Sequence, residues 1–281
     1  MDVITNISPR KTPLFSGLGR SKASNTLHQW LTDGLAASAD NANAESSDAS
    51  VADLTQPVRA VNITQIFRKV VTVSDTEQAV NIGGMKDPYA YQMNKLSAEL
   101  AKDVEKALVA GTIASGSTGV ARRMKGVISW ISTNLTARTT GTSLSETEFN
   151  DIQQAVWNNT DEAADEIYVG AYLKRAISGY TAGNTKNVDA NDKRLVNAVD
   201  VYESDFGLHK VFAHREVPVA AGSAGILALN SKLWKVAVLR PIKHTPLAKT
   251  GNYEKGMIEG ELTLESLNEA GSAYRKGYFV G

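Results

Sequence analysis

The N-terminal fifth of the chain cannot build a hydrophobic core of its own, and this feature constrains the fold most. Residues 1–34 mix prolines and glycines with isolated apolar side chains and show no sustained strand or helix period. Residues 35–53 are small and polar, so they bury too little apolar area to offset the entropy lost on ordering. We therefore expect an extended arm and a mobile loop that find their apolar contacts on a second copy of the chain.

Charge is segregated within this region. The arm is basic, through Arg10, Lys11, Arg20 and Lys22. The loop is acidic, through Asp33, Asp40, Glu45, Asp48 and Asp53. Both blocks are candidates for contacts between copies, and the alternative is two solvated charge blocks. One exposed ion pair contributes only about 0–1 kcal/mol, so such contacts need repetition around a closed assembly.

The overall composition is that of an ordinary globular protein. The 281 residues hold 30 Lys and Arg against 30 Asp and Glu, without the basic excess typical of proteins whose main task is gripping nucleic acid. Cysteine is absent, which excludes disulfides and thiolate metal sites. No signal peptide and no apolar run of about 20 residues is visible. We expect a soluble protein of the cytosol.

Residues 57–82 are rich in β-branched side chains and predict strands, with one arm of a hairpin returning from the acidic loop. A long helix follows over residues 87–110. Asp87 is a suitable N-cap, Pro88 suits the first helical position, and Gly111 suits the stop. Apolar residues recur at steps of three and four and form one stripe. We expect this helix to lie across a sheet.

The rest of the chain predicts an α+β fold without internal repeats. A Thr-rich linker spans 133–142, and a capping box at Ser145 and Glu148 opens a second helix. A strand at 166–170, a helix at 171–180 and a polar loop at 183–192 come next. Three β-rich segments follow, at 195–202, 210–219 and 225–229. After them come 233–239, which could form a strand or a short helix, and the segments 242–247 and 257–267.

No constellation of catalytic residues emerges, and no cofactor or metal site is expected. The Gly111–Gly116 segment lacks the lysine of a phosphate loop and follows a helix. The four histidines show no zinc-site spacing, and we interpret them as structural or surface residues. The carboxylates of residues 161–166 fit a solvated turn. The basic cluster Arg122, Arg123 and Lys125 has no interleaved aromatic residues and is an interface candidate.

Tryptophans are most simply core residues, which covers Trp130, Trp157 and Trp234. Trp30 lies in the arm, which has no core of its own. We therefore predict that Trp30 inserts elsewhere, on its own domain or on a neighbouring copy.

One segment is far more specific than the rest. Residues 12–33, TPLFSGLGRSKASNTLHQWLTD, resemble the N-terminal signature of the SU10-like major capsid proteins of tailed bacteriophages. Later pieces match in order: residues 205–207, 236–241, 247–251 and 261–265. Asn230 stands where aspartate is more usual in that family.

The resemblance implies the Hong Kong 97 capsid fold. The segments predicted above match the parts of that fold in order. Residues 1–34 would form the N-terminal arm and 35–80 the E-loop with its returning strand. Residues 81–125 would form a peripheral domain with the spine helix 87–110, and 126–246 the axial domain. Residues 247–281 would return to the peripheral sheet.

The resemblance also implies a structural shell protein and not an enzyme, forming hexamers and pentamers around double-stranded DNA that it contacts without sequence specificity. The shell would assemble in the bacterial cytoplasm as part of the virion, with no membrane. It implies a separate scaffolding protein and a portal, and leaves room for a decoration protein. Two alternatives stay open. One is an encapsulin-type bacterial nanocompartment shell, and the other is a hydrolase that uses His244 or the carboxylates of 161–166.

Overall fold

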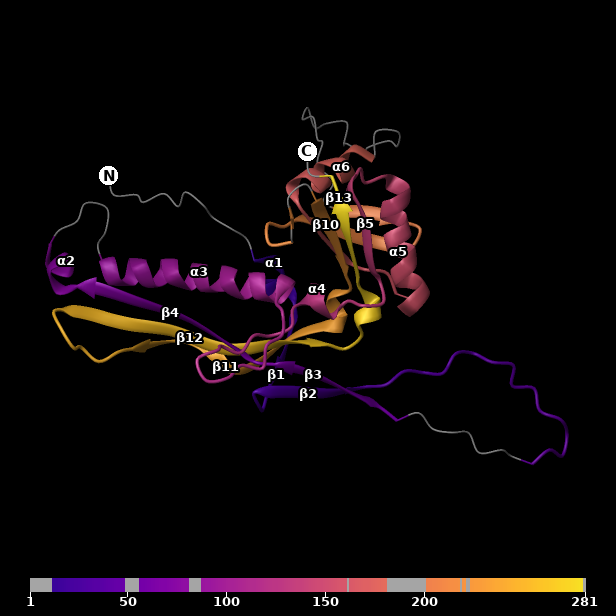
Figure 1. Cartoon of the computed structure of the whole chain (residues 1–281), viewed down its shortest axis with the longest axis horizontal. Helices are drawn as coiled ribbons and strands as arrows, with labels where there is room; N and C mark the ends of the chain where they lie inside the picture. Colours follow the sequence, from indigo (N-terminus) through magenta and orange to yellow (C-terminus); the bar gives the residue numbers. More distant parts are fainter. Residues whose placement is uncertain are drawn as a thin grey trace, which may run out of the picture.

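The computed structural model describes residues 12–48, 56–80, 87–160, 162–180, 201–217, 219–220 and 223–279. Arg10, Lys11 and Asp53 lie outside these ranges. The described chain forms two sheets and a two-stranded ribbon, and Figure 1 shows the long helix α3 over one sheet and α5 and α6 beside the other.

The first sheet has four strands in the order β1-β11-β12-β4. Their bounds are Gly19–Lys22, Trp234–Pro246, Tyr253–Ser266 and Gln65–Ser74. The helix α3, Pro88–Ala110, lies along one face of this sheet, as the single apolar stripe predicts. Its N-cap is confirmed, because the Asp87 carboxylate accepts from the Ala90 amide at 2.9 Å. Its buried side chains include Leu100, Val104 and Leu108.

After α3, the chain turns back and contacts the C-terminal end of that helix. The Gly126 amide donates to the Gly111 carbonyl at 2.9 Å, and the short helix α4, Val127–Trp130, follows. A Cβ at Gly126 would lie 2.7 Å from the Ala107 carbonyl oxygen, so only glycine allows this backbone contact.

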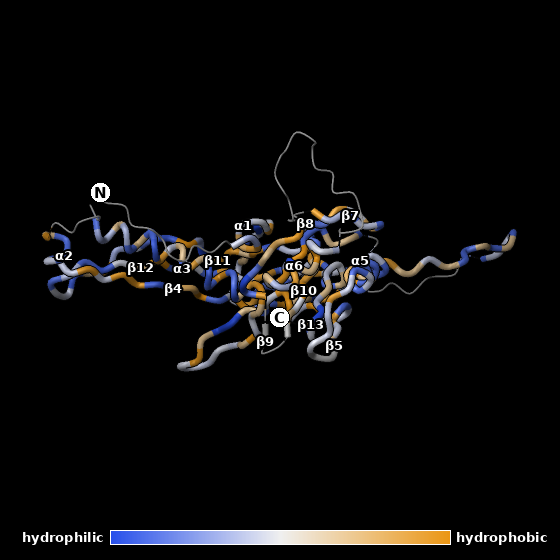
Figure 2. The backbone as a smooth tube through the Cα atoms, turned by 90° about the horizontal axis from the view of Figure 1, so that it is seen from above, coloured by the Kyte–Doolittle hydropathy of each residue, from blue (hydrophilic) through white to orange (hydrophobic). Residues whose placement is uncertain are grey.

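The second sheet has seven strands in the order β5-β13-β10-β6-β8-β7, with β9 paired to β10. Their bounds are Leu135–Thr142, Ala273–Tyr278, Ser223–Leu229, Glu166–Val169, Gly207–Ala213, Val201–Ser204 and, for β9, Val219–Ala220. The helices α5, Glu146–Thr160, and α6, Ala171–Tyr180, contribute buried side chains to its core, among them Phe149, Ile152 and Ile177. Figure 2 shows the hydrophobic segments gathered around β10 and β13. The predicted capping box is confirmed, since Ser145 Oγ accepts from the Glu148 amide at 3.2 Å.

Residues 12–32 of the N-terminal segment pack against their own chain. The expectation that this segment finds its apolar contacts on a second copy is therefore wrong for these residues. The short helix α1, Pro13–Gly17, buries Leu14 completely against the core beneath α3. Strand β1 adds parallel to β11, and Ala23 is buried beyond it. Because β1 pairs with a strand more than 200 residues away, local periodicity carries no signal for it.

The ribbon consists of β2, Leu27–Thr32, and β3, Val58–Ile63, paired antiparallel from Leu27–Ile63 to Thr32–Val58. The described part of the connection between them, residues 33–48, extends away from both sheets in Figures 1 and 2. Every described residue from 33 to 48 is exposed, in agreement with the expected loop.

Several local predictions need correction. Residues 135–142 form β5 instead of a linker, since threonine favours strands and β13 offers an edge for parallel pairing. Residues 75–79 form the helix α2, capped by Ser74, where the strand run was expected to continue. Trp157 is 43% exposed and is not a core residue, whereas Trp234 is fully buried. The loop 183–192 lies outside the described residues.

The C-terminal strands also differ from the expected division. We expected residues 247–281 to return together to the sheet under the long helix, and β12 does so. However, β13 pairs with β10 and β5 in the seven-stranded sheet, beyond the one-turn helix η3 at Glu269–Gly271. Strand β11, placed before the boundary at 246, lies in the four-stranded sheet because it forms a long antiparallel hairpin with β12.

Over the described ranges, no helix combines the length and the apolar character needed to cross a membrane.

Candidate assembly interface

Trp30 fastens the ribbon to its own chain. Its Nε1 donates to the Ser266 carbonyl at 2.7 Å, and its ring lies 5.6 Å from that of Trp130. Lys125 covers the Trp130 ring, with Nζ 4.1 Å from the centroid. The structure therefore selects the first of our two alternatives for Trp30, insertion on its own domain.

Asn62 is the main residue that holds the second strand of the ribbon, β3, to the rest of the chain. Its Nδ2 donates to the carbonyls of Leu264, at 2.7 Å, and Lys125, at 3.0 Å. Its Oδ1 accepts from the Ile63 and Lys125 amides, each at 2.9 Å. The side chain is fully buried, so its amide meets the requirement that buried polar atoms find partners. The base of the ribbon is thus a fixed part of the fold.

The opposite face of the ribbon carries apolar side chains in solvent. Pairing sets Leu27 opposite Ile63 and Leu31 opposite Arg59 on this face. Leu27 is 41%, Leu31 65% and Val61 38% exposed. Gln29 and Arg59 lie on the same face, where Arg59 Nη1 donates to Gln29 Oε1 at 3.1 Å. Exposed apolar side chains interspersed with such polar groups on a projecting ribbon are typical of a surface that another protein covers.

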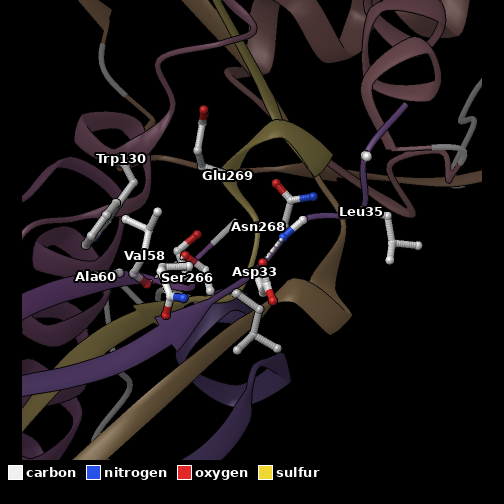
Figure 3. A pocket seen from close by; sticks show the side chains of 13 residues that line it. Asp33, Leu35, Val58, Ala60, Trp130, Ser266, Asn268 and Glu269 are labelled. Atoms are coloured by element: carbon white, nitrogen blue, oxygen red, sulfur yellow. Dashed lines mark hydrogen bonds between the residues drawn. The ribbon is translucent and has the colours of Figure 1, made fainter. Parts of the chain in front are cut away.

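A cleft of about 550 Å³ lies where the ribbon joins the body. Figure 3 shows Trp130 and Leu35 on opposite sides of it. Glu269, at its rim, accepts from the Ser132 amide at 2.8 Å and from the Thr133 amide at 3.3 Å. Burial alone would raise the pKa of Glu269, but the hydrogen bonds from the Thr133 hydroxyl and from these amides outweigh it and lower the pKa. No histidine, lysine or cysteine is among the described residues that line the cleft.

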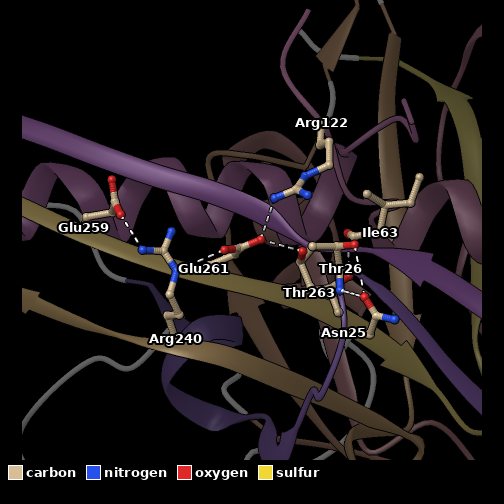
Figure 4. A network of polar contacts seen from close by, with 9 residues as sticks. Asn25, Thr26, Ile63, Arg122, Arg240, Glu259, Glu261 and Thr263 are labelled. Carbon is tan, nitrogen blue, oxygen red and sulfur yellow. Dashed lines mark hydrogen bonds and ion pairs between the residues drawn. The ribbon is translucent and has the colours of Figure 1, made fainter. Parts of the chain in front are cut away.

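A network of alternating charges crosses the four-stranded sheet on the face away from α3 (Figure 4). At its centre, the buried Glu261 accepts from Arg122 Nη2 at 2.7 Å, from Thr64 Oγ1 at 2.7 Å and from Arg240 Nε at 3.0 Å. Glu259 continues the network to Arg240 Nη1, at 2.7 Å, and Arg68 Nη2, at 2.5 Å. The hydrogen bond from Arg68, followed by that from Arg240, lowers the pKa of Glu259. These pairs connect β4, β11 and β12 within one chain.

The predicted interface residues fall into three groups. Arg122 and Lys125 are engaged within the chain, and Arg20 lies over the Phe15 ring at 4.3 Å. Exposed side chains without an ion pair in the described part of the chain belong to Lys22, Asp40, Glu45, Asp48 and Arg123. Arg10, Lys11 and Asp53 lie outside the description. Whether the exposed members meet another subunit stays a prediction.

Sequence reasoning missed a buried junction at Glu105. This side chain on α3 is 1% exposed and accepts from the amides of Leu14, at 2.9 Å, and Phe15, at 2.7 Å. His214 Nε2 lies 2.7 Å from the same carboxylate, and the Glu216 amide donates to His214 Nδ1 at 3.1 Å. Because Nδ1 accepts, Nε2 carries the proton and donates to Glu105. The junction binds α1, α3 and the chain after β8 together.

The other buried histidine is also structural. His209 is fully buried, with Nε2 2.6 Å from Ser204 Oγ and Nδ1 at the Ala164 carbonyl. Burial lowers the pKa of His209. Ser204 Oγ also accepts from the Phe206 amide at 3.2 Å, which closes the turn between β7 and β8. His244 is exposed and contacts Tyr89 at 3.0 Å. No cluster of metal-ligating side chains is found among the described residues.

Comparison with known proteins points to one family. The sequence matches the family described as SU10 major capsid protein over residues 1–278. It is 27% identical to the major capsid protein of Escherichia phage Phieco32, over 94% of this chain and 89% of that protein.

Solved structures share the fold at low sequence identity. The capsid protein of cyanophage A-1(L) superposes with a TM-score of 0.69 at 12% identity, over 100% of this chain and 96% of that one. The SrpI encapsulin of Synechococcus elongatus PCC 7942 gives a TM-score of 0.66 at 10% identity, over 99% and 91%. The nanocompartment alternative thus shares the fold alone, while the phage family shares the sequence as well. The chain belongs to the SU10 major capsid protein family, and it is a structural component of a tailed-phage head with the Hong Kong 97 fold.

Proposed function

We propose that this chain forms hexamers and pentamers that close into an icosahedral shell around double-stranded DNA. In this arrangement the four-stranded sheet with α3 is the peripheral part, and the seven-stranded sheet is the axial part. The ribbon and its connection act as the E-loop and reach a neighbouring subunit. A separate scaffolding protein and a portal complete the assembly, and a decoration protein could cover the outside.

The observation that carries the proposal is the projecting ribbon. Its inner face is fixed by Trp30 and Asn62, whereas its outer face exposes Leu27, Leu31 and Val61. A rigid base with a solvent-exposed apolar face suits a permanent contact with a second subunit. Since a closed shell repeats each contact by symmetry, modest individual contacts suffice.

The DNA contact of the proposal is unspecific. Lys and Arg balance Asp and Glu at 30 each, so the chain lacks the charge excess that tight phosphate binding needs. The shell would enclose the DNA without binding it tightly.

The experiment is expression of the chain with negative-stain microscopy of the product. The full chain, with its scaffolding protein if required, should give closed shells. A variant with residues 35–55 replaced by a short Gly-Ser linker should stay folded, with an unchanged melting temperature, and should form no shells. Deleting residues 1–34 is a poorer test than the sequence alone suggests, because it also removes Leu14 from the core. Shells of normal size from the loop-replaced variant would contradict the proposal.

A further inference from the structure

Three segments of the described chain connect the four-stranded sheet and its helices to the seven-stranded sheet. They run from α4 to β5, from β10 to β11 and from β12 to β13, as residues 131–134, 230–233 and 267–272. The Leu267 amide donates to the Leu233 carbonyl at 2.8 Å, and Asn134 Nδ2 donates to the Ala270 carbonyl at 2.7 Å. Because these contacts tie the segments to one another, the three form one joint between the sheets, at the foot of β13 in Figure 1.

Glu269 clasps two segments of this joint. Its carboxylate accepts from the Ser132 amide at 2.8 Å, from the Thr133 amide at 3.3 Å and from the hydroxyls of both residues. The pKa of Glu269 is lowered by these hydrogen bonds, so the carboxylate stays ionised near neutral pH. Hydrogen bonds to an ionised carboxylate are stronger than neutral ones, but they depend on distance and direction. The clasp therefore holds only while the two segments keep their relative position.

The ribbon is fastened next to this clasp, on the same two stretches of chain. Trp30 Nε1 donates to the Ser266 carbonyl at 2.7 Å, and the Trp30 ring lies 5.6 Å from the Trp130 ring. Ser266 precedes Glu269 by three residues, and Trp130 precedes Ser132 by two. Trp30 and Glu269 thus hold one pair of chain segments at neighbouring points. A displacement of the ribbon must therefore move the backbone that carries the clasp.

The cleft of about 550 Å³ at the base of the ribbon leaves room for such a displacement. Val58 and Ala60 of the ribbon line it together with Trp130, Ser266 and Glu269 (Figure 3). Close-packed interiors resist motion because every displaced atom meets another. Here one side of the contact between ribbon and joint is open, so the ribbon can tilt without a clash on that side.

We propose that the ribbon and the joint form one coupled element, in which Trp30 transmits the position of the ribbon to the Glu269 clasp. A ribbon held by a neighbouring subunit keeps the clasp closed and fixes the seven-stranded sheet relative to the four-stranded one. A free ribbon allows the clasp to open. This inference rests on the proposed function for the neighbour, and it adds a control of the subunit's own shape. Because coupling free energies are reciprocal, loosening the clasp must also loosen the ribbon.

Hydrogen exchange in unassembled subunits tests the coupling in both directions. Trp30→Phe keeps a ring beside Trp130 and removes the indole donor. The Ser132 and Thr133 amides should then exchange at least fivefold faster. In the reverse direction, Glu269→Gln should speed the exchange of the Trp30 indole proton at least fivefold.

Matched controls separate the coupling from general destabilisation. Trp157→Phe changes an exposed tryptophan on α5, and Glu99→Gln changes a partly exposed carboxylate on α3. Both should leave these exchange rates within twofold of wild type. Exchange in the buried strand β10 reports global unfolding and should also stay within twofold. Cross effects below fivefold in either direction, or an equal acceleration in β10, overturn the coupling.

Assembled shells test the part played by the neighbouring subunit. In wild-type shells the Ser132 and Thr133 amides should exchange at least tenfold more slowly than in free subunits. In Trp30→Phe shells the slowing should be less than threefold, because the ribbon is held but its link to the clasp is broken. Any other pair of values overturns the control of the clasp by the neighbour. If wild-type subunits form no shells, the proposed function fails, while exchange in free subunits still decides the coupling.

Discussion

Removal of the Glu105 carboxylate should detach the N-terminal segment and destabilise the subunit. Glu105 accepts three hydrogen bonds, from the Leu14 and Phe15 amides and from His214, over distances of 2.7 to 2.9 Å. Both Glu105 and His214 are almost completely buried, with side chains 1% and 2% exposed. Because the site is buried, these three donors cannot form replacement hydrogen bonds with water when the Glu105 carboxylate is removed.

The magnitude follows from the number of donors left without a partner. Each buried donor without an acceptor costs about 1–3 kcal/mol, and breaking a buried pair by removing one partner costs about 3–5 kcal/mol. We expect Glu105→Ala to lower the free energy of unfolding by about 4 kcal/mol. Glu105→Gln keeps the shape and one acceptor oxygen, so we expect a loss of about 2 kcal/mol.

Urea unfolding of unassembled subunits, followed by tryptophan fluorescence, measures the loss, and hydrogen exchange at the Leu14 and Phe15 amides locates it. Both amides should lose their protection in Glu105→Ala. The control is Glu99→Ala on the same helix, whose carboxylate is 37% exposed and 3.9 Å from Lys69; it should cost under about 1 kcal/mol. A cost below about 1 kcal/mol for Glu105→Ala, or unchanged protection at Leu14 and Phe15, would refute this reasoning.

Three further predictions concern the ribbon, the turn after α3 and the response to pH. Asn62→Ala removes four hydrogen bonds from a fully buried site and should cost about 2–4 kcal/mol in urea unfolding, with faster proteolysis at the ribbon. Gly126→Ala places a Cβ 2.5 Å from the Gly111 nitrogen and should lower the melting temperature by several degrees, about 2–4 °C per kcal/mol lost. The control for this substitution is Gly17→Ala in α1, where the added Cβ meets nothing within 4 Å; it should leave the melting temperature unchanged or raise it. Burial lowers the pKa of His209, so the unfolded chain binds more protons than the folded one just below the ordinary value of 6.5. Stability is therefore fully present above that value and is lost as the pH falls toward the pKa of the folded state; His209→Gln should show a smaller loss between about pH 7 and about pH 5.5 in urea midpoints.

Local patterns in the sequence were sufficient where the stabilising contacts are local. Helix α3 combines a capping aspartate, Pro88 at its first position and one apolar stripe, and all three act within a few residues of one another. The capping box of α5 is of the same kind. The exposed loop followed from composition, because segments of Ala, Ser, Asn and Asp bury little apolar area wherever they occur.

Contacts between distant segments escaped sequence reasoning. Glu105 occupies a position that the helical pattern assigns to no particular partner, and the groups that hold it, at Leu14 and His214, are 91 and 109 residues away. The parallel strand β5 depends on β13, more than 130 residues later. The available signal for Glu105 was a charged residue within an otherwise apolar stretch of a helix surface. The role of its carboxylate, to accept hydrogen bonds from the backbone of α1, can be recognised only once α1 is packed against the helix.

The division between the docked and the projecting parts of the N-terminal region reflects where apolar side chains stop. Up to Thr32, the segment supplies Leu14, Leu18, Ala23 and Trp30, and each packs or bonds within its own subunit. From Asp33 to Asp48 the largest apolar side chain is Leu35, which is fully exposed, and carboxylates replace the cations of the arm. Along this region, the contacts that hold the chain to its own subunit therefore end at Thr32, although Leu27 and Leu31 on the outer face of the ribbon are exposed. Within residues 12–48 we therefore expect substitutions of the buried Leu14, Leu18 or Ala23 to act on folding, and substitutions of the exposed Leu27, Leu31 or the carboxylates after Thr32 to act on assembly.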